Sequence, residues 1–425
     1  MESSTPESSL SPEFNKRLKK RYNAEQRFKI LGIGAIFIAL AFLVFLMSTV
    51  IMNGHSAFMQ TYVKLDFTLD KKYFTDEDLS KGDFQGIVKA TLYGMFPDVT
   101  SRRDKRALTG MVSKGAAFNL MDMVREDPSL VGKEVSVWVP ANDDVDMLMK
   151  GNIDMSQPEA NRRIKDNQYG WIQTLEADER LQMKFNVNFL TSGDSREPEL
   201  AGIWSAVKVS FYTLVITMLL SFPIGVAAAV YLEEFAPDNK FTDLIEININ
   251  NLAAVQSIIF GLLGLAIFIN FCGIPRSTPL VGGLVLTLMT LPTIIIAARA
   301  SLKSVPPSIR EAALGVGASK IQTVFHHVLP LALPGMLTGT IIGMAQALGE
   351  TAPLLMIGMV AFIVDIPGSI TDPAAALPVQ IYLWADSPER AFTEKTSAAI
   401  MVLLAFLITM NAAAVFMRKK FEIEW

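Results

Sequence analysis

Residues 310–330 read REAALGVGASKIQTVFHHVLP, a polar segment held between two strongly apolar stretches. Pro307 suits the first turn of a helix, where no backbone donor is needed, and Ser304 before it is a good N-cap. Gly315 and Gly317 predict the end of this helix, because glycine enters left-handed backbone without a steric penalty. Apolar residues at i, i+3, i+4 and i+7 from Ile321 predict a second helix. Two short helices at an angle form a knob that fits a groove on another protein; the alternative is an amphipathic connector on lipid headgroups.

The flanking sequence predicts a membrane protein. Hydrophobic residues make up 51% of the 425 residues. A helix needs about 20 apolar residues to cross about 30 Å of hydrocarbon. Six charge-free windows exceed this length, at residues 30–63 (apolar through Met52), 209–232, 247–275, 277–298, 321–349 and 396–417. We therefore expect six transmembrane helices, with Pro330 and Pro334 limiting how far the second helix of the 310–330 segment runs.

Lysine and arginine set the expected orientation, because short cytoplasmic loops are enriched in them. Residues 1–29 carry seven basic side chains and residues 299–320 carry four, whereas residues 365–395 hold five acids and two bases. Six spans then place both termini and the 299–320 loop in the cytoplasm. Residues 233–246 depart from this pattern, since this expected cytoplasmic loop holds five acids and one lysine.

The expected fold class is an all-α polytopic membrane protein with a soluble α+β domain inserted between transmembrane helices 1 and 2. The expected divisions are a basic, disordered cytoplasmic tail at 1–29, transmembrane helix 1 at 30–52, an extracytoplasmic insert at 53–200, a core with helices 2–6 and a loop (299–330) at 201–417, and a second cytoplasmic tail at 418–425.

The insert has 148 residues, enough for its own hydrophobic core. Period-two alternation predicts half-buried strands through Val63, Leu65 and Phe67, through Val135, Val137 and Val139, and through Leu181, Met183, Phe185, Val187 and Phe189. Helical spacing around Phe118 predicts a helix that Asp127 and Pro128 end. A docking surface for a soluble partner and a purely structural module both remain open.

Charge and cysteine content limit what the insert is expected to do. Its 19 basic and 24 acidic residues are interspersed, so the sequence predicts no charged ligand surface. Cys272 is the one cysteine of the chain and lies in the third window, so the insert forms no internal disulfide. Three histidines are too few for a metal site, and no basic aromatic patch suggests nucleic acid.

Small residues in the fifth window predict close helix packing. Gly335, Gly339 and Gly343 recur every four residues, and such a face lets another helix approach closely. The alternative is that glycine is simply common in membrane helices.

Polar residues in the apolar windows are candidates for a transport path. Glu350, followed by Thr351, is deep in apolar sequence, where an ionisable group normally faces a cavity or a partner; Pro353 should kink the helix nearby. A buried carboxyl that locks helices together is the alternative. Thr290, with threonines three residues before and after it, either lines a path or bonds carbonyls of its own helix. Arg299 lies at the cytoplasmic boundary, where an arginine usually extends its charged end to the membrane interface (snorkelling).

Residues 201–425 resemble the phosphate importer permeases known as the PstA family. The resemblance rests on E-A-A at 311–313 with Gly317 and Leu329-Pro330, on A-L-G-E-T-A-P-L-L at 347–355 and on A-A-L-P-V-Q-I-Y at 375–382. Gln346 and Ile296 stand where the family pattern has arginines, and His327 where it has isoleucine. The 53–200 insert lies outside the shorter family pattern.

The resemblance implies a six-helix permease of the type I ABC importer (MetI-like) kind in a bacterial inner membrane. It implies four partners: a homologous second permease subunit, a cytoplasmic ABC ATPase dimer, an extracytoplasmic phosphate-binding protein and membrane lipid. Residues 311–317, including Glu311, Ala312, Ala313, Gly315 and Gly317, would then couple to the ATPase. The chain itself would bind no cofactor and hydrolyse no ATP, since no G-x-x-x-x-G-K-[ST] motif occurs in it.

Three other functions are open at this point. A permease for another oxyanion, such as phosphonate, would share these motifs. A membrane-anchored sensor would need an output module, for which the 29-residue and eight-residue tails leave no room. An ion-coupled carrier relies on inverted repeats, and we find no convincing repeat.

Overall fold

The computed structural model describes residues 12–74 and 79–421, which fall into two compact units, residues 1–53 and 54–425. The first unit is essentially one helix, α1 (Pro12–Gly54). The prediction of a disordered tail is wrong for residues 12–29, which are helical, while residues 1–11 lie outside the described residues. The sequence between Phe14 and Gly32 contains no glycine or proline, and Glu25 pairs with Lys29 one turn away at 2.7 Å.

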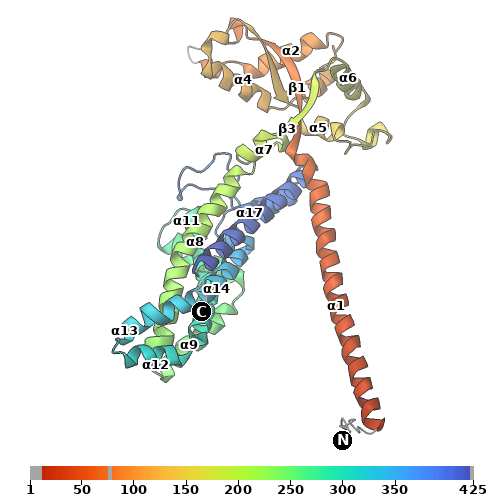
Figure 1. Cartoon of the computed structure of the whole chain (residues 1–425). Helices are drawn as coiled ribbons and strands as arrows, with labels where there is room; N and C mark the ends of the chain where they lie inside the picture. Colours follow the sequence, from red (N-terminus) through yellow and green to blue (C-terminus); the bar gives the residue numbers. More distant parts are fainter. Residues whose placement is uncertain (1–11, 75–78, 422–425) are drawn as a thin grey trace. The chain divides into compact units, whose positions relative to one another are not determined.

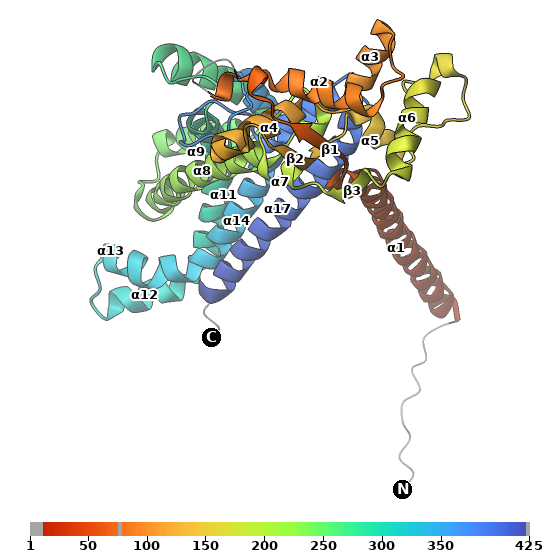
Figure 2. The ribbon, with the colours of Figure 1, turned by 90° about the horizontal axis from the view of Figure 1, so that it is seen from above.

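The second unit contains a three-stranded antiparallel sheet in the order β2-β1-β3; Figure 1 labels β1 and β3, and Figure 2 labels all three strands. Its strands are β1 (Met59–Thr68), β2 (Glu134–Pro140) and β3 (Leu181–Phe185). The third predicted strand is too long, because Val187 and Phe189 belong to a helical turn, α7 (Val187–Thr191). Asn186 ends the strand: its side-chain oxygen accepts a hydrogen bond from the Phe189 amide at 3.0 Å and so caps α7.

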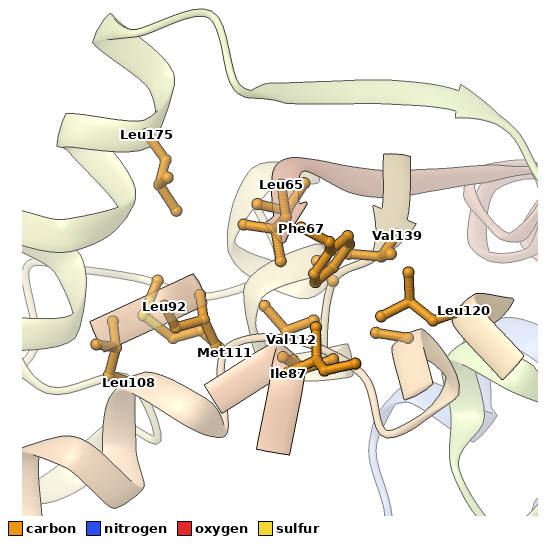
Figure 3. Close-up of a cluster of buried hydrophobic side chains, with 14 of the residues drawn as sticks. Leu65, Phe67, Ile87, Leu92, Leu108, Met111, Val112, Leu120, Val139 and Leu175 are labelled. Carbon is orange, nitrogen blue, oxygen red and sulfur yellow. The ribbon is translucent and has the colours of Figure 1, made fainter. Parts of the chain in front are cut away.

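Helices cover one face of this sheet and enclose the insert's core (Figure 3). They are α2 (Phe84–Met95), α3 (Arg102–Thr109), α4 (Gly115–Glu126), α5 (Asp143–Met149) and α6 (Asp166–Ala177). Helix α4 stops directly before the predicted Asp127-Pro128 end. Leu65 and Phe67 of β1 are fully buried among residues such as Ile87 and Leu120, so the alternation in β1 separates core from surface as predicted.

Four long apolar helices form the membrane bundle of the second unit: α8 (Trp204–Val230), α11 (Pro279–Ser304), α14 (Leu329–Gly349) and α17 (Ala391–Phe421). With α1, five helices of the described chain are long and apolar enough to span a membrane. The third predicted span is a bent pair: α9 (Lys240–Ala253) meets, at 102°, α10 (Ser257–Gly264) together with the π-helical turn Leu265–Phe271 that continues it. Counted as one span, this pair brings the described chain to the six spans predicted. The first half of that window carries Asn248, Asn250 and Asn251, polar side chains that are costly next to lipid, whereas the second half is largely apolar and carries one asparagine, Asn270.

Two predictions about prolines need correction. Pro330 and Pro334 do not end a helix, because α13 (Lys320–Thr323), a π-helical turn (Val324–Val328) and α14 run on without a break. The wider π turn lies just before Pro330, where a missing donor would otherwise interrupt the regular ladder. Near Pro353 the helix breaks rather than kinks: α14 stops at Gly349, and α15 (Ala352–Met356) starts anew before α16 (Leu377–Ala385).

Buried charges join the insert to the last helix of the bundle. The Lys150 ammonium of α5 lies 2.7 Å from Asp146 and 2.6 Å from Glu394 of α17, and these three side chains are only 5%, 10% and 9% exposed. The neighbouring Lys395 donates a hydrogen bond to the Ala201 carbonyl at 2.9 Å. Because buried charges are tolerated only when paired, these contacts fix the insert to the bundle.

Candidate functional site

The 299–330 loop folds as two short helices around a left-handed glycine. Helix α12 (Pro307–Gly315) begins after Pro306, with Pro307 in its first turn. Ser304 is not its cap, because α11 continues through that residue and the Ser304 hydroxyl bonds the Ser301 carbonyl. Gly317 has a φ of +90°, a backbone conformation that favours glycine. Helix α13 then starts from Ser319, whose side chain forms a capping box with Gln322.

An arginine on α12 anchors this loop to the end of α8. The Arg310 guanidinium donates to Glu234 at 2.6 and 3.1 Å and to the carbonyls of Val305 and Leu302 at 2.8 and 3.0 Å. The Glu234 side chain is 9% exposed. Charge-assisted bonds of this kind are shorter and stronger than neutral ones, so the base of the knob is held rigidly.

Three of the five acids in residues 233–246, namely Glu233, Glu234 and Glu246, are partners of the basic loop. Arg299 pairs with Glu233 at 3.4 Å and also with Glu246, and Lys303 lies 3.7 Å from Glu233. A π-helical turn, Tyr231–Phe235, carries both Glu233 and Glu234. The sequence signal for these pairs was the excess of acids in residues 233–246, which departs from the positive-inside pattern. The sequence does not show that these acids pair with the bases of the 299–330 loop, because only folding brings the two segments together.

The knob presents apolar side chains to solvent. Leu314 is 51% exposed, Val316 85%, Ile321 61% and Phe325 53%. Of the predicted coupling residues, Glu311, Ala312, Gly315 and Gly317 are exposed, Ala313 is buried, and Leu329 and Pro330 are half-buried at the start of α14. An apolar surface on a polar loop is typical of a protein-docking site.

The three glycines predicted to pack lie along α11. A methyl group at Gly335 would overlap Ser301, and one at Gly339 would overlap Ala297. At Gly343 the nearest atoms, on Ile294, are 3.9 Å away. Helices α11 and α14 are thus antiparallel neighbours at close range, and the loop connects their adjacent ends.

The candidate path residues do not converge within this chain. Arg299 lies near the carboxyl end of α11, next to the 299–330 loop, and is paired with carboxylates. Glu350 and Thr351 lie in the break between α14 and α15, at the end of α14 that is far from this loop. Thr290 is buried, and its hydroxyl donates a hydrogen bond to the Leu286 carbonyl at 2.9 Å. This is the second of the two roles considered for it, a bond to a carbonyl of its own helix. Gln346 is exposed on α14.

Comparisons with known proteins agree with this geometry. Residues 201–422 match the family described as "Binding-protein-dependent transport system inner membrane component", and residues 15–159 match a domain of unknown function, DUF3333.

Curated relatives cover about half of the chain. "Probable ABC transporter permease protein YqgI" of Bacillus subtilis is 37% identical over 172 residues, 40% of this chain and 58% of the relative. "Phosphate transport system permease protein PstA 1" of Mycobacterium tuberculosis H37Rv is 29% identical over 217 residues, 51% of this chain and 70% of the relative. PstA of Haemophilus influenzae is 28% identical over 226 residues, 53% and 79% of the two chains.

Among solved structures, an inward-facing MetNI methionine ABC transporter covers 52% of this chain and 98% of its own, at 19% identity and a TM-score of 0.43.

Proposed function

Because this chain belongs to the binding-protein-dependent transport system inner membrane component family, we propose that it is the permease subunit of an ATP-driven importer that carries inorganic phosphate into the cytoplasm. The permease role is supported by the matched family and by the exposed apolar knob on the loop between α11 and α14. Phosphate is supported by the names of the relatives from Mycobacterium tuberculosis and Haemophilus influenzae.

The main observation behind this proposal is the knob. Val316 at its tip is 85% exposed, while Arg310 at its base is bound to Glu234, in the π-helical turn that follows α8. In the proposed mechanism a separate cytoplasmic ATPase grips the exposed side chains. Closure of the ATPase then moves two elements together, α8 through the Arg310 pair and α14 through the continuous helix from Lys320 to Gly349. The bundle would rock around a path shared with a second permease subunit, with both termini in the cytoplasm and the insert outside.

The basic contacts to phosphate are proposed to come mainly from the second permease subunit. Within this chain Arg299 is already neutralised by two carboxylates, and Gln346 and Ile296 carry no charge. An extracytoplasmic binding protein would deliver the anion.

The test is phosphate uptake by vesicles that contain the complete transporter, with Val316→Asp as the perturbation. A charge at the tip would have to be desolvated on docking, so ATPase co-purification and uptake are both expected to fall strongly. Ser308→Asp adds the same charge to an exposed residue in the first turn of α12 and is expected to leave both intact.

Unchanged ATPase binding and uptake with Val316→Asp would overturn the coupling role. Uptake that phosphonate or sulfate abolishes, but that excess unlabelled phosphate does not, would overturn phosphate as the substrate.

A further inference from the structure

The insert carries a cavity of about 300 Å³ between α2, α3 and the start of α4. Cationic side chains line it from three separate elements: Lys89 of α2, Arg106 of α3 and Lys114 before α4. Thr109, Ser113 and Asn142 add polar groups, and the rest of the lining, mostly apolar, comes from Gln85, Val88, Gly110, Val112 and Ala117. No carboxylate is among the described residues that line this cavity, so its charge is positive.

Two of these cations have no ionic partner in the described chain. Lys89 and Arg106 are both exposed, and neither forms an ion pair with any residue in 12–74 or 79–421. Arg102 and Arg103 add two more positive charges at the start of α3, and neither forms an ion pair with a described residue. Lys114 pairs with Glu197 at 2.5 Å, but its side chain is 70% exposed; an ammonium has three donors, so this pair leaves two of them for a ligand.

The backbone adds to the positive potential. Helix α4 has 12 residues, and its first two amides are already bonded to Ser113: the Gly115 amide donates to the Ser113 hydroxyl and the Ala116 amide to the Ser113 carbonyl, each at 3.1 Å. The dipole of the helix still adds partial positive charge at this end of the cavity. A side chain at Gly115 would overlap Leu200, which shows that this end of α4 is held in place by the segment leading to α8.

From this convergence we propose that the cavity is a binding site for a small oxyanion of the phosphate or sulfate type. Such a ligand accepts several charge-assisted hydrogen bonds at once, and guanidinium and ammonium donors on different elements converge on the cavity. Glu197 neutralises part of the Lys114 charge, so Lys89 and Arg106 carry most of the positive charge of the site. The site lies in the insert, away from the bundle path, so the proposal stands independently of the transport function.

From the sequence we expected no charged ligand surface in the insert, because its acids and bases are interspersed along the chain. The proposed site departs from that expectation. Folding brings α2, α3 and the start of α4 together, and these contribute bases here while their nearby acids point elsewhere: Asp83 caps α2 and Asp104 bonds Asn167.

The test is a titration of the purified full chain in detergent with inorganic phosphate, at constant ionic strength and with chloride as the reference anion. The variant Lys89→Gln/Arg106→Gln removes the two unpaired cations of the cavity. Arg125→Gln/Lys133→Gln is the matched control, because it removes two exposed bases of the same insert outside the cavity.

Saturable phosphate binding is expected for the native chain and for the control. The cavity variant should lose at least roughly tenfold in affinity, about 1.4 kcal/mol, because it lacks two charged hydrogen-bond donors. Lys89→Arg keeps the charge and is expected to retain binding. Equal binding in both double variants, or no saturable binding to the native chain, would overturn the proposal. Unfolding of each variant without phosphate, expected to match that of the native chain, separates lost binding from lost folding.

Discussion

Replacing Lys150 with methionine should destabilise the attachment of the insert to the bundle far more than its single charge would suggest. Methionine fills a similar volume but leaves two carboxylates, Asp146 and Glu394, buried without their shared cation. Asp146 keeps one further bond, from the Thr61 amide at 2.7 Å. Glu394 has no other hydrogen-bond or ion-pair partner among the described residues. The buried Lys395 ammonium attracts both carboxylates without bonding to either, so it compensates only part of their charge.

The expected cost follows from the burial of all three groups. Removing one partner of a buried ion pair typically costs about 3–5 kcal/mol, because an uncompensated charge stays in a medium of low polarity. Glu394→Gln in the same chain removes one of the stranded charges, so the double variant Lys150→Met/Glu394→Gln should recover a large part of this loss.

The assay is chemical unfolding of the purified chain in detergent, followed by tryptophan fluorescence. Lys114→Met is the matched control, because the Lys114–Glu197 pair has a similar 2.5 Å separation but is 70% and 32% exposed; an exposed pair contributes about 1 kcal/mol or less. If Lys150→Met costs no more than Lys114→Met, or if the double variant is the least stable of the set, the reasoning about a buried charge junction fails.

Three further outcomes can be checked on the same protein. Gly339→Ala should lower the melting temperature in detergent, because the new methyl overlaps α11, whereas Gly343→Ala, with 3.9 Å of space, should change it little. Burial raises the pKa of Glu199 from 4.5 to about 7, so the folded chain holds an extra proton between these values and its stability should fall as pH rises from about 4.5 to 7. Glu199→Gln should reduce this slope in melting curves recorded across that range, and part of the slope should remain because burial also raises the pKa of Asp143 to about 6. Glu234→Gln should weaken the bond to Arg310 and reduce phosphate uptake while the ATPase still co-purifies, which a pull-down and an uptake assay on one preparation can show.

Much of the architecture was predictable because its signals are local. Charge-free windows and the period-two alternation in β1 and β2 reflect a side chain's immediate surroundings, lipid or core. The alternation matches both strands, and five of the six windows fall on single long apolar helices, while the third falls on the bent pair. The errors arose where local patterns compete. Asn186 ends β3 by capping a new turn although the alternation continues to Phe189, and the π turn before Pro330 lets a helix continue where proline usually stops it.

The sequence by itself determined a multi-pass membrane chain with a large insert and a polar two-helix loop, since span length, hydropathy and glycine geometry are properties of consecutive residues. Only the tertiary structure decided which charges meet. Glu234 lies 76 positions from Arg310, and Lys150 lies 244 positions from Glu394, and no periodicity links residues so far apart. Electrostatic partners are chosen by distance in space, so they become known only once the chain has folded.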